Sequence, residues 1–150
     1  MNTQHILATT LITSTLFATV SAAYSWGLAS RRMKLWSEVP SAFRPAFFQL
    51  ESGPETYQWS SPATPRRTFE AKLFLYFDAR DPLTPGTTAI NAALDAIDAA
   101  LAASGVDLSS GRQTLGGAVY DCKIVGVPVR DTGDLDGDGL AVVSVSLVAP

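Results

Sequence analysis

Hydrophobic side chains recur at helical spacing in two parts of the chain. Residues 1–30 contain no Lys, Arg, Asp or Glu and predict an N-terminal helix. The apolar side chains that would share one side of it are Ile6, Leu16, Phe17, Val20 and Tyr24. Residues 87–103 predict a clearer helix, ended by Gly105. Its apolar stripe consists of Ile90, Leu94, Ile97 and Leu101.

Apolar residues at every second position predict a strand at residues 67–79. Its apolar face consists of Phe69, Ala71, Leu73, Leu75 and Phe77. The opposite face begins with the polar Glu70 and Lys72 but continues with Phe74 and Tyr76. This apolar end predicts cover from a helix or from a neighbouring subunit.

Three further strands are predicted at residues 46–51, 113–126 and 139–150. The apolar face of the second would carry Tyr120, Cys122 and Ile124. The inward face of the third would carry Val143, Val145 and Leu147. Residues 53–67, rich in proline and small polar residues, predict an extended loop or a hairpin arm.

These elements predict a single domain over residues 1–150, a length that can bury a substantial core. The expected class is α/β (α+β), with a four-stranded, mostly antiparallel sheet. The N-terminal helix and the central helix would pack on this sheet, in the order α-β-β-α-β-β.

The N-terminus also has features of a secretory signal peptide, since Val20-Ser21-Ala22 resembles a small-residue cleavage site. However, the stretch lacks a basic start, and frequent Thr and Ser residues interrupt its apolar run. It is also too polar for a membrane span, which needs about 20 mostly apolar residues. The pattern favours a packed helix, with a cleaved signal over residues 1–22 as the alternative.

Composition excludes several classes of site. One cysteine, Cys122, rules out an internal disulfide and a multi-cysteine zinc site. The one histidine, His5, lies at the N-terminus, which disfavours a catalytic triad. The net charge of −3 and the dispersed Lys and Arg residues do not match a nucleic-acid binder that works by neutralising phosphates. We therefore predict no catalytic residue and no cofactor.

The stretch DTGDLDGDGL, residues 131–140, matches the first half of a calcium loop. The second half does not match, because Val145 occupies the position that needs a glutamate, and a predicted strand replaces the second helix. Asp and Gly also suit a turn between strands. The sequence predicts an acidic turn rather than a metal site.

Two groups of residues are candidates for a protein interface. Arg31 and Arg32 beside Trp36 suggest a protein contact or a solvated edge rather than nucleic-acid binding. The second group lies in residues 53–67, where a long loop is expected to have a function. Trp, Tyr and Arg dominate interface energetics. The members of this second group are Tyr57, Trp59, Arg66 and Arg67.

Four stretches together resemble a known family: residues 31–55, 71–79, 113–126 and 133–150. The most specific pieces are the Arg-Arg…Trp…Val-Pro…Pro-Ala-Phe-Phe-Gln string and Gln-Thr-Leu-Gly-Gly-Ala-Val. Over residues 31–150 the chain resembles the tail-terminator or tail-completion proteins of long-tailed double-stranded-DNA phages and prophages. The Thr-rich, uncharged N-terminal helix departs from the family pattern.

The resemblance implies a structural virion protein without enzymatic activity or cofactor. Its partners would be its own copies in a ring, commonly a homo-hexamer, the tail tube protein and the head–tail connector or neck protein. It would be assembled in the host cytoplasm and lie at the head-proximal end of the tail, without membrane contact. DNA would pass through the ring without specific binding, which suits a net negative subunit.

Other functions stay open at this point. A neck or connector subunit and a tail-tube subunit share the expected architecture. A small secreted binding domain would follow from the signal-like N-terminus, and a calcium-binding module from the acidic stretch.

Overall fold

The computed structural model describes residues 3–51, 55–59, 65–78, 86–102, 111–131 and 138–149. Two α-helices, three short 3-10 turns and six strands are described in this part of the chain. In chain order they are α1 (Thr3–Ala23), β1 (Leu28–Ser30), η1 (Trp36–Glu38), η2 (Ser41–Phe43), β2 (Ala46–Leu50), β3 (Glu55–Trp59), β4 (Pro65–Asp78), α2 (Gly86–Ala100), η4 (Leu115–Gly117), β5 (Asp121–Asp131) and β6 (Asp138–Val148).

The strands form one six-stranded mixed sheet in the order β1-β2-β4-β6-β5, with β3 also paired to β4. The β1–β2 pair is parallel, and the other described pairs are antiparallel. The predicted four-stranded sheet and the order α-β-β-α-β-β, inferred for a ring-forming subunit, are therefore wrong. The missed strand β1 has three residues and no alternating pattern, so only its pairing with β2 makes it a strand, whereas β3 lies in the segment predicted as a loop or a hairpin arm.

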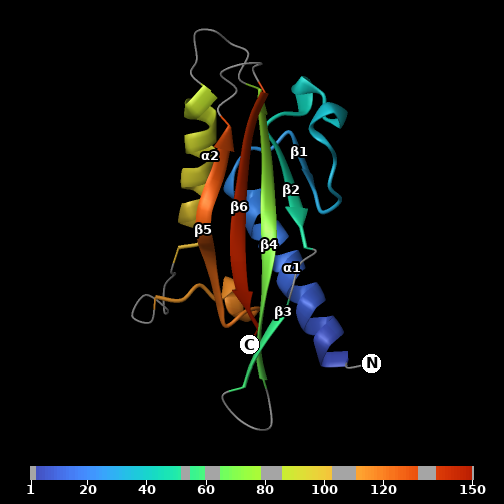
Figure 1. Cartoon of the computed structure of the whole chain (residues 1–150), viewed down its shortest axis with the longest axis vertical. Helices are drawn as coiled ribbons and strands as arrows, with labels where there is room; N and C mark the ends of the chain where they lie inside the picture. The colour runs from blue at the N-terminus through green and yellow to red at the C-terminus, as the bar shows by residue number, and fades with distance from the viewer. Residues whose placement is uncertain are drawn as a thin grey trace.

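Both helices lie on one face of the sheet, where the main core forms (Figure 1). From α1 it takes Ile12, Leu16 and Val20. From α2 and the turn that follows it takes Ile90, Ala93, Ile97 and Leu101. Alternate residues of the long central strands contribute Ala71, Leu73, Leu75, Phe77, Ala141, Val143, Val145 and Leu147. Further buried members are Phe47, Leu115, Val119, Cys122 and Ala149. The apolar positions expected on this face of β4 and β6 are fully buried apart from the half-buried Phe69.

Helix α1 ends at Ala23, before the expected end at residue 30. Beyond the helix, Gly27 lies close to the backbone of η2, since a Cβ at this position would lie 2.6 Å from the Phe43 carbonyl oxygen. The Gly27 N–H also donates to the Pro45 carbonyl at 2.8 Å. This close approach leads the chain out of the helix and into β1.

The opposite face of the sheet has a second, smaller core. Its buried members are Val39, Ala46, Phe48 and Tyr76. The Tyr76 hydroxyl donates to the Lys34 carbonyl at 2.8 Å, and half-buried Met33 packs on the same cluster. The segment around η1 and η2 thus covers the apolar end of β4. The expected cover from a helix or a neighbouring subunit is wrong there, because the chain supplies it locally.

Strand β5 begins at Asp121, so the strand predicted over 113–126 is wrong in its first half. Leu115, Gly116 and Gly117 all have positive φ (49°, 73° and 96°), which a strand does not allow. The buried Gln113 side chain fixes the turn instead. Its Nε2 donates to the Ala102 carbonyl at 2.6 Å, and its Oε1 accepts from the Leu115 N–H at 3.0 Å.

Candidate protein interface

Residues 55–59 and 65–69 form a hairpin arm at one end of the sheet. Of the two possibilities for residues 53–67, a loop or a hairpin, the described residues show a hairpin. Tyr57 is opposite Arg67 in its antiparallel register. Strand β6 pairs with β4 only from Thr68 onward, so the distal part of the arm projects beyond the rest of the sheet (Figure 1).

The hairpin arm exposes two aromatic side chains on one of its faces. Tyr57 is 49% exposed and Trp59 is 63% exposed. Because side chains alternate along a strand, these two residues point to the same side. Large apolar surface left in water is typical of an interaction site, and Trp and Tyr contribute most to binding at interfaces. The arm is therefore the main candidate surface.

The two arginines of the arm occupy different surroundings. Arg67 contacts Glu55 across the hairpin, with 3.4 Å between its Nη1 and Glu55 Oε1. Arg66 lies on the opposite face, with its guanidinium 3.8 Å from the centroid of the Tyr120 ring. Arg67 thus stabilises the hairpin, whereas Arg66 belongs to a second cluster.

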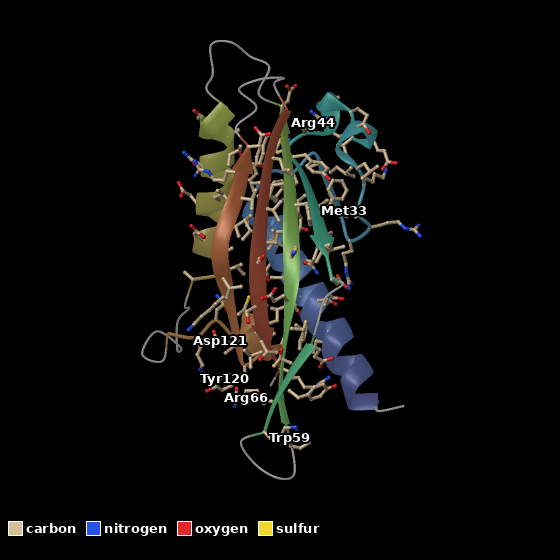
Figure 2. The ribbon with its side chains drawn as sticks, viewed as in Figure 1. Met33, Arg44, Trp59, Arg66, Tyr120 and Asp121 are labelled. Carbon is tan, nitrogen blue, oxygen red and sulfur yellow. The ribbon has the colours of Figure 1, made fainter. Side chains whose placement is uncertain are left out.

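That cluster consists of Arg66, Arg112 and Tyr120, near the base of the arm (Figure 2). The guanidinium of Arg112 lies 4.4 Å from the Tyr120 ring centroid. A hydrogen bond from Arg66 and the positive charges of Arg112 and Arg66 lower the pKa of Tyr120 below its ordinary value. The sequence prediction that Tyr120 shares the core face with Cys122 is wrong, because β5 begins only after it.

We expect Arg66→Gln to raise the pKa of Tyr120. The two arginines favour the deprotonated form of Tyr120. Their interaction with the phenolate therefore stabilises the folded protein above the ordinary tyrosine pKa of about 10, and this stabilisation is lost as the pH falls. Phenolate absorbance should be titrated in both proteins, with Tyr120→Phe to assign the transition. Arg32→Gln is the matched control. An unchanged Tyr120 titration in Arg66→Gln would contradict the contact.

The other predicted basic candidates lie near β1. Arg31 donates to Glu51 Oε1 at 2.6 Å and Oε2 at 2.9 Å, and to Thr13 and Ser14 of α1 at 2.8 and 3.0 Å. Burial acts to raise the pKa of Glu51, but hydrogen bonds from Arg31 and Gln49 outweigh it and lower this pKa. Arg31 therefore joins α1 to the sheet.

The remaining two residues of that group are less informative. Arg32 is exposed, and its N–H donates to the Ser30 hydroxyl at 3.0 Å. Trp36 begins η1, and its side chain lies outside the described part of the chain. The structure thus places Tyr57, Trp59 and Arg67 on one face of the arm and Arg66 on the other, and it does not bring them together with Arg31 and Arg32.

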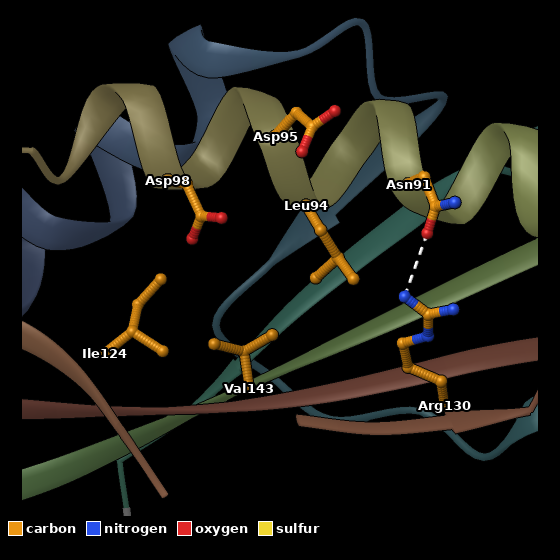
Figure 3. Close-up of a pocket in the computed structure, with 7 residues that line it drawn as sticks. All are labelled: Asn91, Leu94, Asp95, Asp98, Ile124, Arg130 and Val143. Atoms are coloured by element: carbon orange, nitrogen blue, oxygen red, sulfur yellow. Dashed lines mark hydrogen bonds between the residues drawn. The ribbon is translucent and has the colours of Figure 1, made fainter. Parts of the chain in front are cut away.

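A groove of about 370 Å³ lies between α2 and β5, which we call the α2–β5 groove (Figure 3). It is lined by Asn91, Leu94, Asp95, Asp98, Ile124, Arg130 and Val143. At one end, Arg130 Nη1 donates to Asn91 Oδ1 at 2.9 Å. Neither aspartate forms an ion pair within the described residues. This groove was not predicted from the sequence.

Cys122 is buried in the main core at the start of β5. Burial and the negative charge of Asp121 raise its pKa to about 12. Since the thiolate is the reactive form, we expect native Cys122 to resist alkylation at neutral pH. Iodoacetamide labelling followed by mass spectrometry should show modification only after denaturation. Rapid labelling of the folded protein would contradict this burial.

The acidic stretch lies mostly outside the described residues, including Asp134 and Asp136. Asp138 opens β6, opposite Asp78 of β4. The next residue, Gly139, is buried, and a Cβ there would lie 3.2 Å from Phe77 Cβ. This part of the motif thus belongs to a strand, and its glycine packs closely against Phe77.

Within the described residues, no three metal-binding side chains gather at one point. No described helix is both long and apolar enough to cross a membrane. Comparison with known protein families and with curated proteins gives no match.

Proposed function

We propose that this chain is a structural virion protein, a phage tail terminator that forms a ring and joins the tail to the head connector. The observation that carries the proposal is the hairpin arm with its exposed Tyr57 and Trp59. Such a projecting aromatic surface fits a subunit that assembles with copies of itself or with tube subunits. The partners would be further copies, the tail tube protein and the connector or neck protein.

A second support comes from the string that carries the family resemblance. Its Arg31 binds α1 and Glu51, and its Gln49 donates to the Thr13 carbonyl at 3.0 Å. Its Val39, Ala46 and Phe48 make up most of the smaller core. The residues of this string thus hold α1, β2 and the smaller core of this chain together.

The alternative of a secreted domain with a cleaved signal is less consistent with the core. Ile12, Leu16 and Val20 are fully buried within it. Removal of residues 1–22 would expose the sheet face that they cover. An intact-mass measurement tests this point, because cleavage would shorten the chain by about 22 residues.

Immunogold labelling tests the function itself. Antibody raised against the purified chain should label tails of the phage or prophage that encodes it, only at the head-proximal end. Label along the whole tail would indicate a tube subunit and overturn the proposal. Absence of label from purified tails and virions would also overturn it. Negative-stain images of the purified chain supply a second readout, in which closed rings are expected.

A further inference from the structure

We infer that the hairpin arm of one copy inserts its aromatic side chains into the α2–β5 groove of a second copy. This inference rests on the proposed function, since it specifies how copies of a ring subunit would contact one another. The occupant of the groove would be the face of the arm that carries Tyr57 and Trp59.

The groove combines an apolar floor with a polar rim that is acidic at Asp95 and Asp98, while Arg130 at one end is hydrogen-bonded to Asn91 (Figure 3). Leu94, Ile124 and Val143 supply the apolar side chains. Asp95 and Asp98 of α2 supply carboxylates, which accept hydrogen bonds but cannot donate them when ionised. An occupant should therefore be flat and apolar and should carry hydrogen-bond donors at its edge.

The arm has these properties. The rings of Tyr57 and Trp59 are apolar, and the phenol O–H and indole N–H are donors. Residues two apart on a strand are about 6.8 Å apart along it. Side chains three apart on a helix have Cβ atoms about 5–6 Å apart, so Asp95 and Asp98 match the two donors in spacing. The groove also lies in the size range of ligand pockets, about 300–1,000 Å³.

The arm cannot reach the groove of its own chain. Strand β3 pairs with β4 on the side of β2, whereas the groove lies beside β5 at the other edge of the sheet. Figure 1 shows the arm and α2 well apart. The contact would therefore join two different surfaces of two copies. Such a head-to-tail contact repeats from copy to copy and closes into a ring when the rotation allows it.

Side-chain insertion fits this edge better than addition of a strand. The register of β5 against β6 shifts between Val125 and Val129, and Gly126 within this bulge has a φ of 70°. Pro128 lacks an N–H in the same region. Bulges and proline interrupt the edge against which another strand could pair. The side-chain groove on the α2 side stays accessible.

Complementary variants test the contact. The arm variant carries Tyr57→Ala and Trp59→Ala, and the groove variant carries Asp95→Arg and Asp98→Arg. Sedimentation of each alone should show self-association weakened about tenfold or more. An equimolar mixture should form dimers but no larger species, because the intact arm of one variant occupies the intact groove of the other and only a mutated arm and a mutated groove remain free. Matched controls are Leu35→Ala, at an apolar residue that is 66% exposed, and Glu70→Arg, and both should assemble normally.

A cross-linking experiment tests the same contact even where copies of the chain associate only weakly in solution. Trp59→Cys and Asp98→Cys in one chain should form an intermolecular disulfide under mild oxidation, on purified protein or on tails. Assemblies that both variants leave unchanged would overturn the inference, as would tail-end labelling without the cross-link. Either result would leave the proposed function intact. Absence of the protein from tails, in contrast, would overturn both the proposed function and this inference.

Discussion

Replacing Ile97 by alanine is expected to lower the free energy of unfolding by about 2–5 kcal/mol. Ile97 is fully buried where α2 packs on the sheet, so the substitution removes apolar contacts and leaves a cavity. Leu94, one turn earlier on the same stripe, is only half-buried and lines the α2–β5 groove. Leu94→Ala should therefore cost about 1 kcal/mol.

Urea denaturation of both variants measures this difference. The slope of the unfolding free energy against urea should stay the same, so that the midpoint reports stability. Equal losses for the two variants would show that the stripe is buried uniformly and that the groove beside Leu94 is filled. That result would also weaken the inference about the arm.

The periodic elements could be predicted from the sequence because their patterns are local. Helix α2 and strands β4 and β6 lie within a few residues of the expected positions, and their apolar faces form the main core. Elements that depend on distant partners could not be predicted. Strand β1 exists because Leu28–Ser30 pair with Ala46–Phe48, and no property of three residues reveals such pairing.

Turn chemistry explains why the strand predicted to begin at residue 113 begins only at Asp121. Gly116 and Gly117 lie within the strand predicted at residues 113–126, but both have positive φ and belong to a 3-10 turn. Gln113 fixes this turn through its buried side chain, and a lone glutamine gives no pattern to recognise. The same early break places Tyr120 beside Arg66 instead of in the core.

The candidate site was predictable only in part. The exposed aromatic residues of the arm could be selected because Trp and Tyr within a proline-rich stretch are conspicuous. The groove could not, since Asp95 and Asp98 have the spacing of an ordinary solvated helix face. Only the packing of α2 on β5 and β6 brings Ile124 and Val143 beneath them.

Phe47→Ala is expected to be the most destabilising single substitution considered, with a loss of about 3–5 kcal/mol. Phe47 is fully buried in β2. Its ring stacks on Phe17 of α1 and packs against Trp26, each with centroids 5.5 Å apart. It therefore joins the N-terminal helix to the sheet, and its removal should loosen α1 as well as create a cavity.

A double-mutant cycle with Phe17→Ala separates these two effects. If the rings stabilise each other, the double variant should lose less than the sum of the single losses, with a coupling of about 0.5–3 kcal/mol. Phe43→Ala is the control, because Phe43 is 51% exposed and its loss should change stability by no more than about 0.5 kcal/mol. A Phe47→Ala protein with near-normal stability, or additive losses with Phe17→Ala, would contradict the docking of α1 on the sheet. Since α1 covers the sheet face that a signal-peptide cleavage would expose, the same result would strengthen the secreted-domain alternative.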